Sequence, residues 1–189
     1  MSQARIAPMT PDEFLAWEAQ QELKWEFDGF QPYAMTGVTD AHGAIQVNLL
    51  VALGTRLRGK PCFPRGPEVK VQAGFSYRYP DAFVSCTPVP GTATIHTEPV
   101  VIFEIISKST ERTDRFVKLR EYRALPSLHR YVILESDEAA ATAYVRRGGA
   151  WVVEEVNAGG TLPLPDIGIA IPMDDLYEGL DFPGQAPPP

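Results

Sequence analysis

The stretch VVIFEIISKST, residues 100–110, places one carboxylate in the middle of an apolar segment. Four apolar residues precede Glu104 and two isoleucines follow it, a pattern typical of a strand that is buried on both faces. A carboxylate in such a strand is costly unless it is paired, protonated or bound to a metal ion. The partners of Glu104 are therefore the first question that this sequence raises.

The segments before this strand carry local signals for a helix and a hairpin. A short helix is predicted after Thr10, because Pro11 suits the first helical position and Glu13 completes a capping box. The pair Asp28-Gly29 lies between two aromatic-rich arms and predicts a β-hairpin.

Apolar periodicity and breaker residues predict the other elements. A helix over 40–57 has an apolar stripe made of Ile45, Leu49, Leu53 and Leu57. Further predictions are strands at 68–72, 79–86 and 131–135; a helix that ends near Ala124, with its N-cap at Ser109, Thr110 or Thr113; a hairpin over 141–156 that turns at Gly148-Gly149; and a last strand with a helical turn within 164–180.

The size and composition of the chain fit one globular domain. With 189 residues, 44% of them hydrophobic, the chain is long enough to bury a sizeable core. The predicted fold class is α/β (α+β), with a mixed β-sheet flanked by helices. We expect one domain over residues 1–180 and a disordered proline-rich tail over 181–189.

Hydropathy and cysteine content set expectations about location. No apolar run approaches the ~20 residues that a membrane helix needs, and the first residues lack the apolar region of a secretory signal. Cys62 and Cys86 show no pairing by spacing and form no CxxC motif. We therefore expect free thiols in a reducing cytoplasm.

The charge distribution leaves two interpretations open. A net charge of −7 argues against a protein that simply coats nucleic acid. The segment from Lys108 to Arg130, however, has seven basic residues and three acidic ones. Such a segment suits an anionic substrate or, equally, a solvated helix face.

Motif searches exclude several chemistries and leave carboxylates on strands. The chain has no GxxxxGK, GxGxxG, HExxH or GxSxG motif, and a content of only three histidines argues against a zinc site built from histidine and cysteine. Asp81 begins one apolar strand and Glu104 lies within the next. Two such acids on adjacent strands can share one Mg²⁺ ion, which needs one or two protein carboxylates. A nearby lysine would complete a set for phosphodiester hydrolysis.

These residues resemble the PD-(D/E)XK nuclease superfamily, with Pro80-Asp81 as its first part and Glu104 as its second acid. Ile106 occupies the position where that signature has lysine. Longer runs resemble the Uma family of bacterial proteins, which are grouped with restriction endonucleases of this superfamily. These runs are YPDAFVSC (79–86), EPVVIFEIISKST (98–110) and DRFVKLREYRALPSLHRYVILE (114–135), together with WEFDG (25–29) and His42. The resemblance extends over about residues 10–178.

The resemblance implies a restriction-endonuclease-like core and a role for each matching residue. Asp81 and Glu104 would bind Mg²⁺ or Mn²⁺, and Lys118 would replace the missing strand lysine as the third catalytic residue. Glu26 would be a third acid beside them. The other supporting residues are Asp114 and Tyr122, which share a helix face with Lys118 by their i, i+4, i+8 spacing, and also His42 and Lys108, a second candidate for the lysine role.

Each of these residues also has a purely structural interpretation. Glu104 could form a buried salt bridge with Lys118 or Lys108, and Asp81 could accept hydrogen bonds from backbone amides. Lys118 and Asp114 could form a surface pair on their helix. Glu26 could be solvated, His42 could simply begin a helix, and Tyr122 could be a core residue with a hydrogen-bonded hydroxyl.

Three functions are compatible with these residues. The first is a metal-dependent endonuclease that acts on DNA in the cytoplasm, and the resemblance implies that it could work as a homodimer. The second is a catalytically degenerate member that binds nucleic acid or a protein partner, motivated by Ile106 and the negative net charge. The third is a phosphoester hydrolase whose substrate is smaller than DNA.

Overall fold

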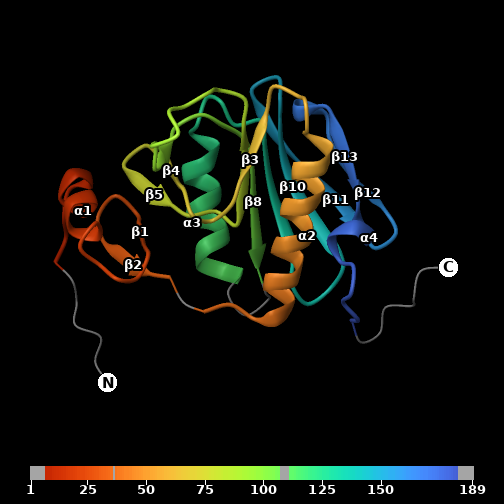
Figure 1. The fold of residues 1–189 in the computed structure, drawn as a ribbon, viewed down its shortest axis with the longest axis horizontal. Helices are drawn as coiled ribbons and strands as arrows, with labels where there is room; N and C mark the ends of the chain where they lie inside the picture. The colour runs from red at the N-terminus through yellow and green to blue at the C-terminus, as the bar shows by residue number, and fades with distance from the viewer. Residues whose placement is uncertain (1–6, 36, 107–110, 183–189) are drawn as a thin grey trace.

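The protein is built around a mixed six-stranded sheet. The computed structural model describes residues 7–35, 37–106 and 111–182, with residues 111–115 described by their backbone only. The order of the sheet is β11 (Ala150–Asn157), β10 (Ala140–Arg147), β9 (Arg130–Glu135), β8 (Pro99–Ile106), β6 (Ala82–Ser85) and β3 (Phe63–Arg65). Strands β8 and β9 are parallel and the other neighbours are antiparallel (Figure 1).

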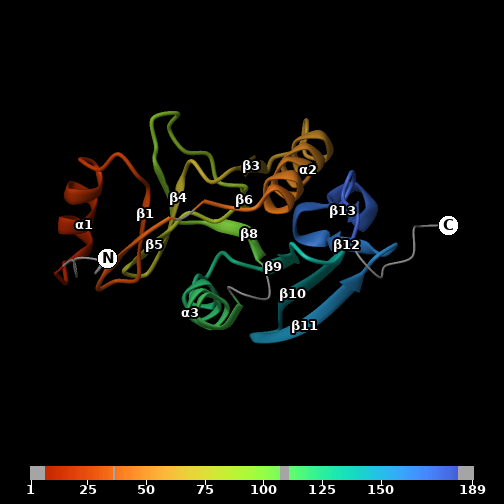
Figure 2. The ribbon, with the colours of Figure 1, turned by 90° about the horizontal axis from the view of Figure 1, so that it is seen from below.

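Two helices cover opposite faces of this sheet. Helix α2 (Asp40–Arg56) lies on one face and α3 (Glu111–Arg123) on the other, as Figure 2 shows. Successive side chains of β8 alternate between them: Val101, Phe103 and Ile105 join the core under α2, whereas Ile102 joins the core with Leu119 and Tyr122 of α3. Both faces of β8 are thus buried, which explains its almost continuous apolar sequence.

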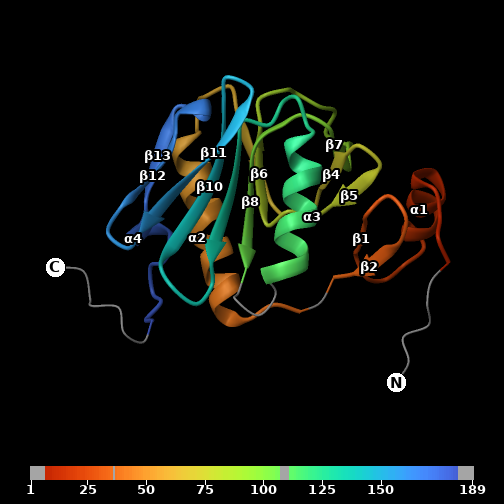
Figure 3. The same ribbon diagram turned by 180° about the vertical axis from the view of Figure 1, so that it is seen from behind.

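A second sheet lies at one end of the molecule (Figure 3). Its order is β2 (Pro32–Ala34), β1 (Trp25–Phe27), β5 (Ser76–Arg78), β4 (Lys70–Ala73) and β7 (Ile95–His96). Helix α1 (Pro11–Glu18) packs on it through a small aromatic core of Phe14, Phe27 and Tyr77. Stacking of Phe14 on Phe27, with ring centroids 4.7 Å apart, fixes α1 against β1.

Local signals predicted the N-terminal elements correctly. Thr10 caps α1, and its capping box with Glu13 is formed in both directions. The hairpin β1–β2 turns at Asp28-Gly29, where Gly29 has a φ of +90°. The predicted second helix and the hairpin at Gly148-Gly149 are also confirmed. Strands β3, β5 and β7 were missed, because two or three residues are too few to show a periodic apolar pattern.

The C-terminal part contains one more strand than predicted. Strands β12 (Thr161–Leu164) and β13 (Ile169–Pro172) form a hairpin, separated by the 3-10 turn η1 (Pro165–Ile167), and α4 (Met173–Leu176) follows. Gly168, at a φ of +66°, makes the return between them possible. Phe182, assigned to the tail from sequence, packs against the ring of Tyr177. Residues 183–189 lie outside the described part of the chain.

The first residue of α3 excludes one of the three residues predicted as its N-cap. The helix begins at Glu111, so Thr113 lies within it and does not precede it. The other two candidates, Ser109 and Thr110, lie outside the described residues.

The expectation of free thiols was wrong, because Cys62 and Cys86 form a disulfide. Strand β3 pairs with β6 so that Phe63 lies opposite Ser85. In the same register, Cys62, which precedes Phe63, lies opposite Cys86, which follows Ser85. Their pairing depends on this non-local register, which spacing in the sequence does not reveal. The cytoplasmic location remains a prediction, and the cysteines no longer support it.

No helix among the described residues is long and apolar enough to span a membrane. The fold class predicted from sequence, mixed sheet flanked by helices, is confirmed.

Candidate functional site

The register between β6 and β8 brings the two predicted metal-binding acids together. Ala82 pairs with Phe103 in this antiparallel ladder. Asp81 immediately precedes β6, so the same register places it opposite Glu104. Residues opposite each other on antiparallel strands have Cβ atoms about 4.5–5.5 Å apart. The two acids predicted from sequence are therefore neighbours in space.

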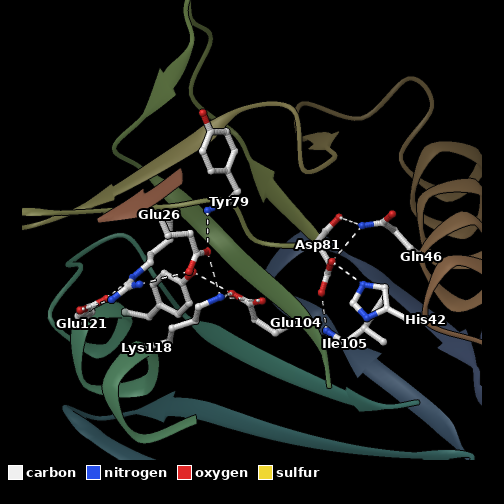
Figure 4. Close-up of polar contacts among 11 residues, drawn as sticks. Glu26, His42, Gln46, Tyr79, Asp81, Glu104, Ile105, Lys118 and Glu121 are labelled. Atoms are coloured by element: carbon white, nitrogen blue, oxygen red, sulfur yellow. Dashed lines mark hydrogen bonds and ion pairs between the residues drawn. The ribbon is translucent and has the colours of Figure 1, made fainter. Parts of the chain in front are cut away.

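Glu104 is buried and is held by two side chains of α3 (Figure 4). The Lys118 ammonium lies 3.2 Å from Oε1 and 3.3 Å from Oε2 of Glu104. The hydroxyl of Tyr122, a fully buried side chain, donates a 2.9 Å hydrogen bond to Oε1. Lys118 and Tyr122 are one helical turn apart, so the predicted common face of α3 does point at Glu104.

Glu26 joins this group through Lys118. Its Oε1 atom lies 3.1 Å from the Lys118 ammonium and accepts a 3.1 Å hydrogen bond from the backbone N–H of Tyr79. Arg78 lies 3.2 Å from Oε2 of the same carboxylate. Glu26 thus contacts Lys118 in the candidate site, and the interpretation of its carboxylate as solvated does not hold.

Arg78 and Glu121 are two site residues that sequence reasoning missed. Arg78 is 4% exposed and forms a bidentate pair with Glu121 of α3, with both N···O distances at 2.8 Å. This pair ties β5 to α3 and so fixes the position of Lys118. No sequence signal could connect the two residues, which are 43 positions apart and belong to an unpredicted strand and a helix surface.

Asp81 has a separate set of partners on the side of α2. Its Oδ1 atom lies 2.9 Å from Nε2 of His42 and 3.0 Å from the side-chain nitrogen of Gln46. Its Oδ2 atom accepts a 2.7 Å hydrogen bond from the backbone N–H of Ile105. Figure 4 shows Asp81 turned toward His42 and Gln46, whereas Glu104 is turned toward Lys118.

Burial and charge set the protonation of the group around Glu104. Burial raises the pKa of Glu104 to about 7, and the negative charges of Asp81 and Glu26 act in the same direction against Lys118. Burial also acts on Glu26, but Lys118 and Arg78 outweigh it and lower the pKa of this carboxyl. The pKa of Lys118 is raised, because the two carboxylates outweigh the desolvation of its ammonium.

The two carboxylates are of the type that a hard divalent cation such as Mg²⁺ prefers, although Asp81 is turned to His42 and Glu104 is turned to Lys118. Asp81 and Glu104 offer carboxylate oxygens from adjacent strands, and Mg²⁺ needs only one or two such ligands beside water and substrate. The negative charge of Asp81 raises the pKa of Glu104, so a cation between them would relieve a repulsion that the structure contains. The described residues form no group of three or more side chains able to ligate a metal.

Some predicted residues cannot be placed or differ from the superfamily signature. Lys108 lies outside the described residues, as does the side chain of Asp114. Ile106 lies on the same face of β8 as Glu104 and packs at the edge of the core under α3. Lys118 is therefore the one described lysine whose ammonium contacts Glu104.

A family model named Uma2, with the description "Putative restriction endonuclease", matches residues 11–174. The chain belongs to the Uma2 family. Two proteins of Synechocystis sp. are similar to this Uma2 chain. "Uncharacterized protein slr1290" is 33% identical over 183 residues, which cover 95% of this chain and 96% of that protein. "Uncharacterized protein sll1609" is 26% identical over 154 residues, which cover 78% of this chain and 87% of that protein.

A solved structure shows that the fold of this Uma2 chain is shared. A crystal structure from Anabaena variabilis, described as a "putative nuclease belonging to DUF820", superimposes with a TM-score of 0.74. The match covers 90% of this chain and 98% of the other at 18% sequence identity. At this identity the likeness establishes a common fold.

Proposed function

We propose that this Uma2 protein is a Mg²⁺-dependent endonuclease that hydrolyses phosphodiester bonds of DNA. The observation that carries the proposal is the placement of Asp81 opposite Glu104, with the Lys118 ammonium 3.2 Å from Glu104. Two carboxylates and a cationic donor are the groups that metal-dependent phosphodiester hydrolysis requires. Membership of a family described as restriction endonucleases adds support.

Asp81 and Glu104 are the residues that would hold Mg²⁺ or Mn²⁺. When bound, the ion supplies positive charge to the scissile phosphate and lowers the pKa of a water molecule. Lys118 places a second positive charge beside Glu104, where it can stabilise negative charge that develops on the phosphate oxygens. Lys118 thus takes the role of the lysine that Ile106 replaces.

The remaining contacts position these three residues. Tyr122 fixes one oxygen of Glu104, and Glu26 holds the Lys118 ammonium in place. His42 and Gln46 fix the orientation of Asp81 from α2. Supporting roles for Lys108 and Asp114 remain predictions, as does homodimer formation.

A non-catalytic nuclease-fold protein is the alternative, and one observation favours it. Lys118 is already paired with both Glu26 and Glu104. Such a closed set of ion pairs is also what a purely structural network would contain. A protein of this kind would bind DNA or a protein partner without cleaving it.

Plasmid cleavage tests the proposal. We expect the purified protein to nick or linearise plasmid DNA with Mg²⁺ or Mn²⁺ and to lose this activity on addition of EDTA. Glu104→Ala should be inactive, whereas Arg58→Gln, an exposed change on a residue outside the site, should be as active as the parent. Equal cleavage by the Glu104→Ala protein would assign the activity to a contaminant. Hydrolysis of a nucleotide phosphoester without cleavage of duplex DNA would favour the smaller substrate.

A further inference from the structure

Arg123 and Arg146 are among the arginines that have no carboxylate partner in the described part of the chain. No ion pair between described residues includes Arg123, at the end of α3, or Arg146, near the end of β10. The arginines that do pair with acids are Arg56, Arg78, Arg130 and Arg147.

Arg123 and Arg146 are instead held against aromatic rings. The Cζ atom of Arg123 lies 5.3 Å from the ring centroid of Tyr144 and 5.6 Å from that of Trp151. The Cζ atom of Arg146 lies 4.9 Å from the same Trp151 ring. Both guanidinium groups therefore contact the same indole ring.

The hydrogen-bonding capacity of these two groups is only partly used. Arg146 donates to the backbone carbonyls of Arg123 and Leu125, at 3.0 and 2.7 Å, and so caps the end of α3. The Nε atoms of both arginines are buried without a hydrogen-bond partner among the described residues. The guanidinium of Arg123 forms no hydrogen bond within the described chain, although the residue is only half-buried. Arginine presents five donors in a planar fork that matches a phosphate. Since the Nε atoms are buried, a phosphate can contact only the terminal nitrogens, and those of Arg123 have no acceptor among the described residues.

Arg120 extends this positive surface. It is exposed and lies three residues before Arg123, so it is on the same side of α3. Within the basic segment 108–130, Lys118 and Arg130 are buried in ion pairs, whereas Arg120 and Arg123 are not. Lys118 and Arg130 thus stabilise the fold, whereas Arg120 and Arg123 have no acidic partner among the described residues.

We propose that this arginine surface, formed by Arg120, Arg123 and Arg146 with Tyr144 and Trp151, binds the phosphate backbone of duplex DNA. The inference rests on the proposed function, because the partner is the substrate of that site. Arg120 and Arg123 lie about 4.5 Å apart along α3. Each DNA strand carries one phosphate per ~3.4 Å of helix axis, so neighbouring phosphates of one duplex can contact both arginines. A protein with a net charge of −7 needs such a local positive surface to hold a polyanion.

Binding of a fluorescent 20-base-pair duplex, measured by anisotropy in EDTA at several salt concentrations, tests this proposal. The variants are Arg123→Gln and the double variant Arg120→Gln/Arg123→Gln, with Arg58→Gln as the matched control of equal charge change. We expect the slope of log K against log salt to fall by about 0.9 for each phosphate contact removed, with roughly tenfold weaker binding for the double variant at 0.1 M salt. The control should bind like the parent.

A second readout follows the two arginines directly. In ¹H–¹⁵N spectra, the Nε–H signal of Arg123, assigned by its absence from the Arg123→Gln protein, should shift when the duplex is added, and so should a signal of Arg146 among those that remain. Circular dichroism and thermal melting of each variant confirm that it is folded. Arg146 itself is not replaced, because it also caps α3.

The outcomes separate this inference from the proposed function. Arginine variants that keep the parental affinity and salt slope would overturn the inference, even if the parent cleaves DNA. A parent that binds no duplex would overturn it as well, as would variants that change only the oligomeric state, which would assign the surface to a second copy. A smaller slope of log K against log salt in the variants, together with no metal-dependent cleavage by the parent, would support DNA binding by the arginine surface and refute the proposed nuclease activity.

Discussion

Replacement of Lys118 by methionine should destabilise the protein in a way that depends on Glu104. The ammonium of Lys118 lies 3.1 Å from Glu26 and 3.2 Å from Glu104, and its side chain is only 12% exposed. At an effective dielectric constant of ~20, each contact represents about 5 kcal/mol of attraction before desolvation is subtracted. Removal of one member of a buried ion pair typically costs about 3–5 kcal/mol, because the remaining charge is buried without its partner.

The charge balance of the site explains why the cost falls on Glu104. Three carboxylates, those of Glu26, Glu104 and Glu121, face two cations, Lys118 and Arg78. Without Lys118, Glu26 still has Arg78, but Glu104 keeps only the hydroxyl of Tyr122 among the contacts described. A second change, Glu104→Gln, removes the unpaired charge and should restore much of the lost stability.

Urea unfolding at pH 8 in EDTA measures these effects. We expect Lys118→Met to lower the free energy of unfolding by about 3–5 kcal/mol. The double variant Lys118→Met/Glu104→Gln should lose much less, so the two changes would be strongly non-additive. A loss below ~1 kcal/mol for Lys118→Met, or additive losses, would refute a buried ion pair between Lys118 and Glu104.

Three further predictions follow from individual contacts. A carboxyl whose pKa is raised to about 7 in the folded state stabilises the fold below its ordinary pKa of 4.5, and this contribution is lost as pH rises through 7. In EDTA, the free energy of unfolding of Glu104→Gln should therefore rise relative to that of the parent as the pH increases from 5 to 8. Urea unfolding at several pH values measures this difference, and a difference that does not change with pH would contradict the prediction. Replacing Cys62 and Cys86 with serine should lower the free energy of unfolding by about 3.5 kcal/mol, because the disulfide closes a loop between residues 24 positions apart. Thiol titration of the unfolded parent should find free thiols only after reduction. Gly29→Ala should cost about 1–2 kcal/mol in thermal melting, because the residue has a φ of +90° and the new Cβ would lie 3.2 Å from that of Phe75; an unchanged melting temperature would contradict the turn.

Local chemistry explains the parts of the fold that could be predicted. The capping box of Thr10, the turn at Gly29 and the apolar stripe of α2 are all encoded within a few residues of one another. The strand around Glu104 was recognisable because it is buried on both faces, which leaves a nearly continuous apolar run.

Non-local register explains what could not be predicted. The disulfide between Cys62 and Cys86 depends on the pairing of β3 with β6, and strand β5 has no periodic signal of its own. Arg78 belongs to that short strand, so its contact with Glu121 could not be foreseen. The partners of Asp81 on α2 likewise depend on how that helix crosses the sheet, although the family resemblance had singled out His42.

The resemblance singled out four residues that the fold brings into contact: Glu26, Glu104, Lys118 and Tyr122. Their catalytic and metal-binding roles remain predictions. Asp81 lies opposite Glu104 in register, yet its carboxylate is held by residues of α2. Whether these two acids act as one metal site is the central claim of the proposed function.

Titration of Mn²⁺ into the metal-free protein, followed by isothermal calorimetry, tests that claim most directly. The parent should bind Mn²⁺ at a site that is lost in both Asp81→Asn and Glu104→Gln, while Arg58→Gln should bind like the parent. Mg²⁺ should compete for the same site. Uptake of Mn²⁺ that is the same in the parent and in both acid variants, or no uptake by the folded parent, would contradict a shared metal site at Asp81 and Glu104.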